Sequence, residues 1–357
     1  MKRICFVVSS PLTARAFLAS HIARLSREFD VAVIANADGL AIEGARFISA
    51  PIERPISPLR DLYALLVLVN VFRRERFDLV HSVTPKAGLL AMMAAWLVRV
   101  PARVHTFTGQ VWVTRTGPAR SFLRFMDGLI ARFATHVLVD SRSQRDFLIQ
   151  QGVVSAAKSA VLANGSICGV DGERFRPRPQ PRADGEVVFL FVGRMGRDKG
   201  VPDLLAAFAR VAQRDPAARL VLVGPDEEGL GRAADKVRWV GSTDRVEDYM
   251  AAADVFCLPS YREGFGQVAI EASACGLPVI ASRIYGLTDA VADGETGFLH
   301  APGDVEALAR HMETLLAQPE LRARLGGAGR ARVLRDFSAE GVSRALVDFH
   351  RRTMDGQ

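Results

Sequence analysis

The sequence predicts two α/β domains, each built on a doubly wound parallel sheet, and three observations support this prediction. Short apolar runs typical of strands alternate with amphipathic segments of helix length. The alternation continues through both halves of the 357-residue chain. A charged segment with three prolines, residues 173–186, separates the halves and is typical of a linker. Because strand–helix alternation favours parallel sheets covered by helices on both faces, we expect two doubly wound domains facing a cleft.

The strand-like and helix-like segments follow the same plan in each half. The first half has strand-like runs at residues 3–10, 30–36, 78–83, 102–109, 135–141 and 159–165. Helix-length segments lie between several of them, at residues 13–29, 59–76 and 142–152. The second half has strand-like runs at residues 187–194, 219–225, 237–242, 254–260, 277–282 and 296–302. We therefore expect an N-terminal domain at 1–175 and a C-terminal domain at 176–337.

Composition and charge limit the class of protein. Hydrophobic residues make up 49% of the chain and charged residues 24%, as in ordinary soluble globular proteins. The first residues are typical of a strand rather than a signal peptide, and the longest apolar run, 87–98, is too short to span a bilayer. Four scattered cysteines without a CxxC pair favour a reduced intracellular chain. Residues 1–175 carry 22 Lys and Arg against 13 Asp and Glu, whereas 176–357 carry 24 against 26, so the first half prefers anionic surroundings.

Two loops of the second half have the residue types that bind phosphate. In doubly wound sheets ligands bind beyond the carboxyl ends of the strands, which here selects the loops at 9–13, 84–86, 106–110, 193–200, 224–228 and 261–266. In the loop at 193–200, which begins with Gly193, Arg194 and Lys199 can close on one anion; a solvated basic loop is the simpler alternative. The bend Gly264–Phe265–Gly266 precedes a predicted helix, and backbone N–H groups at a helix start favour phosphate. This set suits a diphosphate, and no Asp-x-Asp pair or His cluster indicates a metal.

Two carboxylates flank this bend. Glu263 precedes it, and Glu271 lies about one and a half turns inside the predicted helix. A carboxylate on an otherwise apolar helix is costly to bury without a hydrogen-bonding partner. If phosphate binds at the bend, Glu271 can accept hydrogen bonds from a ribose diol, and Glu263 faces whatever is attached to the far phosphate, for which a sugar hydroxyl is a good candidate.

These motifs resemble a known family over nearly the whole chain. The segments "GRMGRDKG" (193–200), "VGSTDRVEDYMAAADVFCLPSYREGFGQVAIEASACGLPVIAS" (240–282) and "NGSICGVDGERFRP" (164–177) resemble the retaining family 4 glycosyltransferases of the GT-B fold. The segments "HSVTPKAG" (81–88) and "HTFTGQVW" (105–112) further resemble the bacterial members that extend polyprenyl-diphosphate-linked glycans for capsule, O-antigen or protein glycosylation. The resemblance implies two Rossmann-like domains, with a last helix at about 338–357 that packs back onto the N-terminal domain.

The resemblance assigns roles to individual residues. It implies that Arg194 and Lys199 neutralise the donor diphosphate, that Glu263 contacts the transferred sugar, and that Glu271 contacts the ribose. His105, placed at the end of the fourth strand, would face the donor sugar; a hydrogen-bonded histidine at a strand end is the structural alternative. The implied donor-binding set is completed by Gly193, Gly264, Phe265 and Gly266. No cofactor and no metal are implied, and the reaction would be a front-face attack in which the leaving phosphate takes the acceptor proton.

The loop after the first strand departs from the family pattern. Many relatives have glycines there, whereas this chain has Ser9, Ser10 and Thr13, so the loop could serve the donor through its hydroxyls or belong to the acceptor site. Lys86 could meet the diphosphate of the acceptor itself. The segment 115–136 places four arginines among large apolar residues, which favours either an ordinary covering helix or a membrane-surface helix.

The resulting hypothesis is a glycosyltransferase that uses a nucleotide-sugar donor and a polyprenyl-diphosphate-linked acceptor. UDP-hexose or UDP-N-acetylhexosamine is the first choice of donor and a GDP-sugar the second. The protein would lie in the cytoplasm, peripherally on the inner face of the cytoplasmic membrane, and would bind no nucleic acid. A GT-B sugar-nucleotide epimerase is the nearest alternative. A nicotinamide dehydrogenase is disfavoured because no G-x-G-x-x-G follows the first strand.

Overall fold

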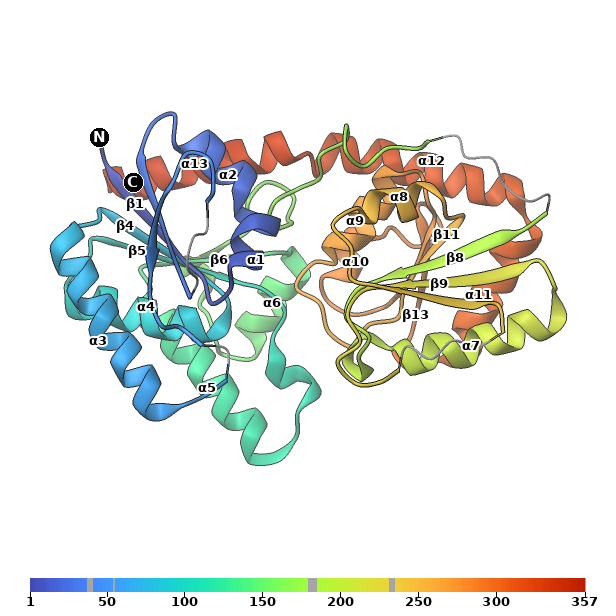
Figure 1. The fold of residues 1–357 in the computed structure, drawn as a ribbon, viewed down its shortest axis with the longest axis horizontal. Helices are drawn as coiled ribbons and strands as arrows, with labels where there is room; N and C mark the ends of the chain where they lie inside the picture. Colours follow the sequence, from blue (N-terminus) through green and yellow to red (C-terminus); the bar gives the residue numbers. More distant parts are fainter. Residues whose placement is uncertain (37–40, 54, 179–184, 231–234, 357) are drawn as a thin grey trace. The chain divides into compact units, whose positions relative to one another are not determined.

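A computed structural model describes residues 1–36, 41–53, 55–178, 185–230 and 235–356, which form two compact units (Figure 1). Unit 1 comprises Met1–Gly169 and Ala339–Gln357, and unit 2 comprises Val170–Ser338. The units divide at 169/170 and 338/339, whereas the sequence analysis placed the divisions at 175/176 and 337/338. Within the predicted linker, residues 179–184 lie outside the described residues. Both units are parallel α/β structures, and the predicted fold class is confirmed.

Unit 1 has a seven-stranded sheet in the order β3-β2-β1-β4-β5-β6-β7, with every neighbouring pair parallel. Its strands are β1 Arg3–Val7, β2 Asp30–Ala35, β3 Arg46–Ser49, β4 Leu79–Val83, β5 Ala102–Phe107, β6 His136–Val139 and β7 Ser159–Ala160. The sequence analysis missed β3, a four-residue edge strand that is only partly buried. His105 consequently lies in the fifth strand rather than the fourth, and inside it rather than at its end.

Helices cover both faces of this sheet (Figure 1). They are α1 Pro11–Thr13, the π-helix η1 Ala14–Leu18, α2 Ala19–Leu25, α3 Pro58–Glu75, α4 Pro85–Leu97, the 3-10 helix η2 Val111–Thr114, α5 Gly117–Phe133, α6 Arg142–Gln150, the 3-10 helix η3 Ala156–Lys158 and α13 Ala339–Asp355. Side chains alternate across β1 as strand geometry requires. Cys5 and Val7 belong to the core under α3, α4 and α5, while Ile4 and Phe6 belong to the core under α2 and α13.

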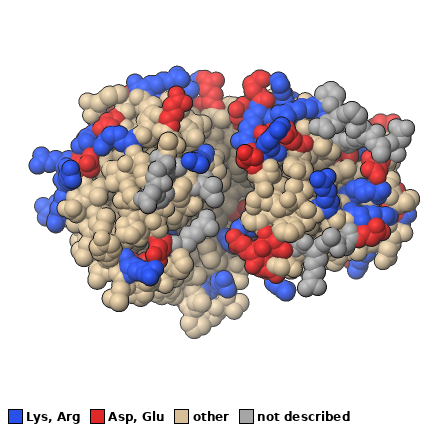
Figure 2. All heavy atoms as spheres, in the orientation of Figure 1, with Lys and Arg blue, Asp and Glu red and all other residues tan. Residues whose placement is uncertain are grey.

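Helices α3 and α5 expose large apolar side chains. On α3, Leu59, Leu62, Tyr63 and Leu66 are between 54% and 83% exposed. Their spacing of i, i+3, i+4 and i+7 places them on one face of the helix, opposite the buried Ala64, Leu68 and Phe72. On α5, Phe122 and Phe125 are more than half exposed. The lower part of unit 1 in Figure 2, where α3 and α5 lie in Figure 1, is accordingly mostly uncharged.

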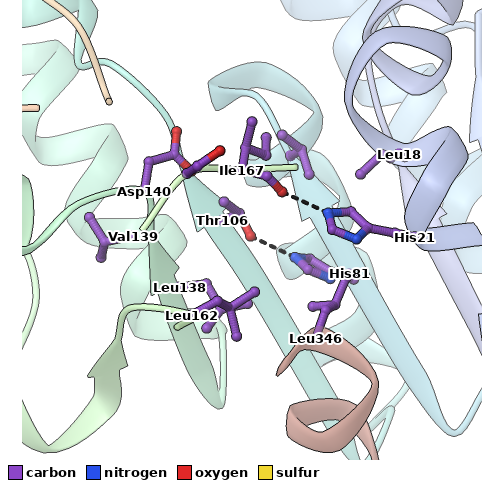
Figure 3. A pocket seen from close by; sticks show the side chains of 12 residues that line it. Leu18, His21, His81, Thr106, Leu138, Val139, Asp140, Leu162, Ile167 and Leu346 are labelled. Atoms are coloured by element: carbon purple, nitrogen blue, oxygen red, sulfur yellow. Dashed lines mark hydrogen bonds between the residues drawn. The ribbon is translucent and has the colours of Figure 1, made fainter. Parts of the chain in front are cut away.

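A buried polar cluster fixes the C-terminal helix α13 to the rest of unit 1. Figure 3 shows two hydrogen bonds of this cluster, between His21 and Ile167 and between His81 and Thr106. His21 of α2 bonds Ser343 Oγ of α13 at 2.9 Å and the Ile167 carbonyl at 2.7 Å. His81 of β4 bonds His350 Nε2 of α13 at 3.0 Å and, through its other ring nitrogen, Thr106 Oγ1 at 2.7 Å. Burial lowers the pKa of His21 and His81 and lowers that of His350 to about 3, so the cluster is uncharged at neutral pH.

Unit 2 has a six-stranded parallel sheet in the order β10-β9-β8-β11-β12-β13. Its strands are β8 Val187–Val192, β9 Ala218–Val223, β10 Val237–Gly241, β11 Val255–Leu258, β12 Val279–Ser282 and β13 Gly297–His300. Its helices are the 3-10 helix η4 Arg197–Lys199, α7 Val201–Arg214, α8 Val246–Ala251, α9 Gln267–Ala274, α10 Leu287–Ala290, α11 Val305–Ala317 and α12 Pro319–Asp336. All six strand-like runs of the second half correspond to observed strands.

Candidate functional site

The strand order of unit 2 brings two of the predicted loops together. β8 and β11 are parallel neighbours in the centre of the sheet. Because the carboxyl ends of parallel strands lie at one edge of a sheet, the loops that follow them, 193–200 and 259–266, meet there. The backbone N–H of Tyr261 donates to the carbonyl of Asp198 at 2.9 Å and joins the two loops directly. The candidate site is built on this contact.

Gly200 permits the close approach of the two loops. It has a left-handed conformation with φ +69° and stands between η4 and α7. A Cβ atom added at Gly200 would lie 2.0 Å from the carbonyl oxygen of Pro259, the first residue after β11. Glycine is therefore required both for the backbone conformation and for the space.

Lys199 and Glu263 form the centre of the site. Lys199 Nζ lies 2.6 Å from Glu263 Oε1, and the Ser260 hydroxyl donates to the same carboxylate oxygen at 2.9 Å. The Lys199 side chain is 19% exposed and that of Glu263 is 14% exposed, so a ligand can reach both. The structure thus brings together a lysine and a glutamate that are distant in the sequence.

Arg194 is paired with two carboxylates in the same region. Its guanidinium lies 3.1 Å from Glu227 Oε2 and 3.1 Å from Asp198 Oδ2. Asp198 also binds Arg262 at 2.8 Å. Burial works to lower the pKa of Arg194, but Asp198 and Glu227 outweigh it and raise the pKa above its ordinary value. Arg194 and Lys199 therefore do not converge on an empty position, because each cation already has a carboxylate partner.

The sequence analysis missed these partners of Arg194. Asp198 stands between Arg194 and Lys199 in "GRMGRDKG" (193–200), so its position in the motif was a usable signal. Glu227 follows β9, and its contact with Arg194 depends on the pairing of β8 with β9, which the sequence does not display. The three cations Arg194, Lys199 and Arg262 are balanced by the three carboxylates Asp198, Glu227 and Glu263.

The bend before α9 has the predicted form. Gly266 has φ +92° and caps α9, which begins at Gln267, and a Cβ atom at Gly266 would lie 2.4 Å from Leu287 Cδ2. Phe265 is buried against Phe337, with ring centroids 5.1 Å apart, and anchors the bend in the core of unit 2. Gly264 approaches the backbone of Gly286, where an added Cβ would lie 2.6 Å from the Gly264 carbonyl oxygen.

Glu271 lies inside α9, as predicted, and its hydrogen-bonding partner is Gln267. The Gln267 side-chain amide donates to Glu271 Oε1 at 3.1 Å, one helical turn away. Burial of the carboxyl raises the pKa of Glu271 to about 7, although the amide of Gln267 opposes this shift. A carboxyl held near its point of half-ionisation is a candidate ligand-binding group rather than a structural ion pair.

His105 belongs to unit 1, whereas Lys199 and Glu263 belong to unit 2. Its Nδ1 bonds the Ser82 hydroxyl of β4 at 2.8 Å, and its ring is only 1% exposed. Burial lowers the pKa of His105 to about 3, which keeps the ring neutral. Gly88 of α4 makes room for the ring, because a Cβ there would lie 2.4 Å from His105 Cε1. Its predicted contact with a donor sugar stays a prediction.

Three of the four residues assigned to the acceptor line one pocket of unit 1. Ser9, Thr13 and Lys86 surround a cavity of about 570 Å³ that also borders α5. Ser9 Oγ lies 3.1 Å from Thr84 Oγ1. Thr84 has φ +78° and ψ 144°, an outlier for a β-branched residue of the kind that gathers at functional sites. Ser10 is instead the N-cap residue of α1.

The metal and membrane predictions concern two other kinds of site. Within the described ranges, no three or more His, Cys, Asp or Glu side chains are grouped so that they could hold a metal ion. Independence from metal stays a prediction. Across the same ranges, no helix combines the length and the apolar character needed to cross a bilayer.

Two Rossmann-like units, the second with paired cations and carboxylates at the carboxyl edge of its sheet, are the architecture of GT-B glycosyltransferases. The family described as "Glycosyl transferases group 1" matches residues 173–332, and that described as "Glycosyl transferase 4-like domain" matches residues 13–165. The capsular polysaccharide biosynthesis glycosyltransferase CapM of Staphylococcus aureus is 31% identical over 307 residues, which are 81% of this chain and 80% of CapM. The chain belongs to the group 1, family 4-like glycosyltransferases, and the predicted enzyme class is confirmed.

Other relatives share the family but have different names. A D-inositol 3-phosphate glycosyltransferase of Saccharomonospora viridis is 32% identical over 80% of this chain and 74% of its own length. Among solved structures, sucrose-phosphate synthase of Thermosynechococcus elongatus has a TM-score of 0.84 and 26% identity over the whole of both chains. HepE of Anabaena in complex with UDP and glucose has a TM-score of 0.82 and 22% identity over 98% of this chain and all of that one, a likeness of fold alone.

Replacing Gly200 by alanine tests the close approach of the two loops. Gly200→Ala is expected to lower the free energy of unfolding of unit 2 by more than about 2 kcal/mol. The left-handed conformation by itself costs an alanine roughly 1–2 kcal/mol, and the clash with the Pro259 carbonyl adds to that cost. Gly229→Ala is the matched control, because Gly229 has φ +70° but a Cβ there meets nothing within 4 Å. Urea denaturation measures both variants, and equal losses would contradict the steric role of Gly200.

Proposed function

We propose that the protein transfers a sugar, with retention of anomeric configuration, from a UDP-hexose or UDP-N-acetylhexosamine to a lipid-linked saccharide in surface glycan biosynthesis. The observation that carries the proposal is the Lys199–Glu263 pair, which lies beside Arg194 and before the helix that holds Glu271. A solved neighbour of the same fold, HepE, binds UDP and glucose, and CapM is named for capsular polysaccharide biosynthesis. Both support this choice of donor and of product class.

Donor binding would proceed by exchange of ionic partners. The diphosphate would take the place of Asp198 and Glu227 at Arg194 and of Glu263 at Lys199, since phosphate oxygens form strong charge-assisted bonds with both cations. Glu263, relieved of Lys199, would accept a hydroxyl of the sugar. The N–H groups at the start of α9 point along the helix axis and would favour the same anion.

The chemical step follows from the charge that develops on the leaving group. The bond between the anomeric carbon and the diphosphate oxygen breaks, the acceptor oxygen bonds to that carbon from the same face, and the acceptor proton passes to the departing diphosphate. Arg194 and Lys199 are in place before the reaction and stabilise the negative charge as it grows, which is the kind of contribution that gives the largest rate effects. His105, which we propose faces the donor sugar, would act as a neutral hydrogen-bonding group.

The acceptor and the location of the enzyme are inferred from the surface of unit 1. The four residues of the apolar stripe of α3, and Phe122 and Phe125 of α5, are more than half exposed, and a row of exposed apolar side chains favours a membrane or interaction surface. Arg120 and Arg124 on α5 add positive charge beside it, as at helices that lie on anionic membranes. We infer a peripheral position on the inner face of the cytoplasmic membrane, where a polyprenyl-diphosphate-linked acceptor would be reached.

Loss of the central cation tests the proposed catalytic site. Lys199→Ala is expected to slow UDP release from UDP-glucose or UDP-N-acetylglucosamine, with membrane lipid extract as acceptor, by about 10²–10³, as for loss of one preorganised electrostatic donor. Arg197→Ala is the control, because Arg197 is in the same loop but its side chain is 81% exposed; its rate should stay within about threefold. Equal losses in the two variants, or none in Lys199→Ala, would remove Lys199 from the mechanism.

The raised pKa of Glu271 predicts a pH dependence of donor binding. At pH 6 the carboxyl is mostly protonated and at pH 8 mostly ionised, since its pKa is about 7. Only the ionised form accepts hydrogen bonds at both oxygens, so UDP-glucose affinity should rise by about tenfold from pH 6 to pH 8, with proton release. Calorimetry in two buffers measures both effects. Glu271→Gln should bind more weakly and lose the pH dependence; an unchanged dependence would place the titration elsewhere.

Vesicle binding tests the membrane surface. The protein should co-sediment with vesicles that contain anionic lipid, and less so at high salt. Replacing two residues of the α3 stripe, Leu62→Gln with Leu66→Gln, should reduce binding by about tenfold, because two apolar side chains no longer leave water. Leu334→Gln, at a 38% exposed leucine of unit 2, is the control and should bind normally. If the wild type stays in the supernatant, the peripheral location is wrong.

A further inference from the structure

Unit 1 contains a cavity that the proposed donor chemistry does not use. Its volume of about 570 Å³ falls within the roughly 300–1,000 Å³ typical of small-molecule sites. The walls come from α4, α5, η2 and the residues that lead into α3. All of these elements belong to unit 1, so the cavity is complete within a single compact unit.

The lining of this cavity is mainly apolar. Its apolar residues include Leu90 of α4 and Leu123, Met126 and Ile130 of α5. Asp127 also borders the cavity, but the Trp112 indole N–H donates to its carboxylate at 2.8 Å, and burial raises the pKa of Asp127 to about 6. The carboxylate of Asp127 is thus buried and already hydrogen-bonded, so the surface that α5 presents to the cavity is mainly that of its apolar side chains.

The polar part of the lining comes from the carboxyl edge of the sheet. Ser9 follows β1 and Thr84 follows β4, which are neighbouring strands, and Thr13 lies in the short helix after β1. Lys86, in the first turn of α4, supplies the positive charge. Its Nζ lies 2.5 Å from Asp61 Oδ1, and the side chain is 15% exposed. Lys86 is thus fixed at the cavity, as Lys199 is at the donor site, with a carboxylate that an incoming phosphate could replace.

The elements around the cavity connect it to the exposed apolar surface. Ile56, which precedes α3, and Phe122 of α5 both line the cavity and are 71% and 53% exposed. The apolar stripe of α3 begins three residues after Ile56, at Leu59. A ligand with a long apolar chain could therefore leave the cavity over side chains that are themselves apolar, toward a membrane on which these helices rest.

We propose that this cavity binds the phosphate-proximal part of an isoprenoid chain, with Lys86 on the phosphate and Leu90, Leu123 and Met126 on the hydrocarbon. The inference rests on the proposed function, because it names the part of the protein that recognises the lipid of a polyprenyl-diphosphate-linked acceptor. A basic group and hydroxyls on one side with apolar side chains on the other match an amphiphile with an anionic head. A purely polar acceptor, such as a soluble sugar, would leave the apolar wall without a function.

The test is binding of farnesyl diphosphate, a short soluble isoprenoid diphosphate, to the full chain by calorimetry. Met126→Glu places a charge in the apolar wall and should weaken binding by at least about tenfold. Ser121→Glu is the control, because Ser121 is an exposed residue of the same helix that does not line the cavity; the affinity of this variant for farnesyl diphosphate should stay within about threefold of wild type. Lys86→Gln should weaken the binding of farnesyl diphosphate by about tenfold but leave the binding of farnesol, which has no phosphate, unchanged.

Three results would overturn the inference. The first is that Met126→Glu binds farnesyl diphosphate as tightly as the wild type does. The second is that the wild type binds inorganic diphosphate as tightly as farnesyl diphosphate. The third is that it binds dodecyl phosphate as tightly as farnesyl phosphate. The last would show a general lipid-phosphate site. UDP-glucose binding is measured on every variant and should be unchanged, which shows that unit 2 is folded, and an unchanged circular dichroism spectrum shows the same for unit 1. If the wild type binds farnesyl diphosphate but not UDP-glucose, the lipid-binding cavity is supported and the proposed function is contradicted. If it binds UDP-glucose but not farnesyl diphosphate, only the proposal for the cavity is contradicted.

Discussion

The parallel pairing of β8 with β11 is the constraint on which the candidate donor site depends. Neither the loop at 193–200 nor the loop at 259–266 contains a complete site by itself. The pairing places both at one edge of the sheet, the Tyr261–Asp198 backbone bond joins them, and Gly200 supplies the space for their contact. Lys199 and Glu263 can then meet at 2.6 Å. A shift in register of either strand would separate the pair.

A second constraint makes unit 1 discontinuous in sequence. The last helix, α13, packs beside α2 and contributes Leu346 and Val347 to the core. Apolar packing alone allows a helix to slide or rotate, whereas His21 and His81 each bond one residue of α13 at a defined position. Buried polar groups of this kind are costly when unpaired, so they favour one register over its alternatives. The uncharged state of these histidines makes that pairing compatible with burial.

The sequence was sufficient for the fold class and for most strands, because these depend on local patterns. Periodicity identified the strands, and the spacing of Glu263 and Glu271 around a glycine bend identified the start of α9. β3 was missed because an edge strand of four residues, two of them exposed and two half-buried, has almost no pattern. The ion pairs of Arg194 were missed because they depend on which strands are neighbours, which periodicity does not determine. The exposed apolar stripe of α3 was not predicted, because both faces of that helix are apolar and the sequence does not show which face is exposed.

The full pairing of the cations has a consequence for selectivity. A ligand that binds both Arg194 and Lys199 must displace carboxylates at both, and the displaced Glu263, whose side chain is only 14% exposed, is costly to leave without a partner. A single phosphate could compensate for one such exchange but not for two at separate positions. A nucleotide sugar could compensate for both, because its diphosphate would serve the two cations while a sugar hydroxyl would satisfy the released Glu263. The same carboxylates that neutralise the cations of the site would thereby exclude simple anions and admit the complete donor.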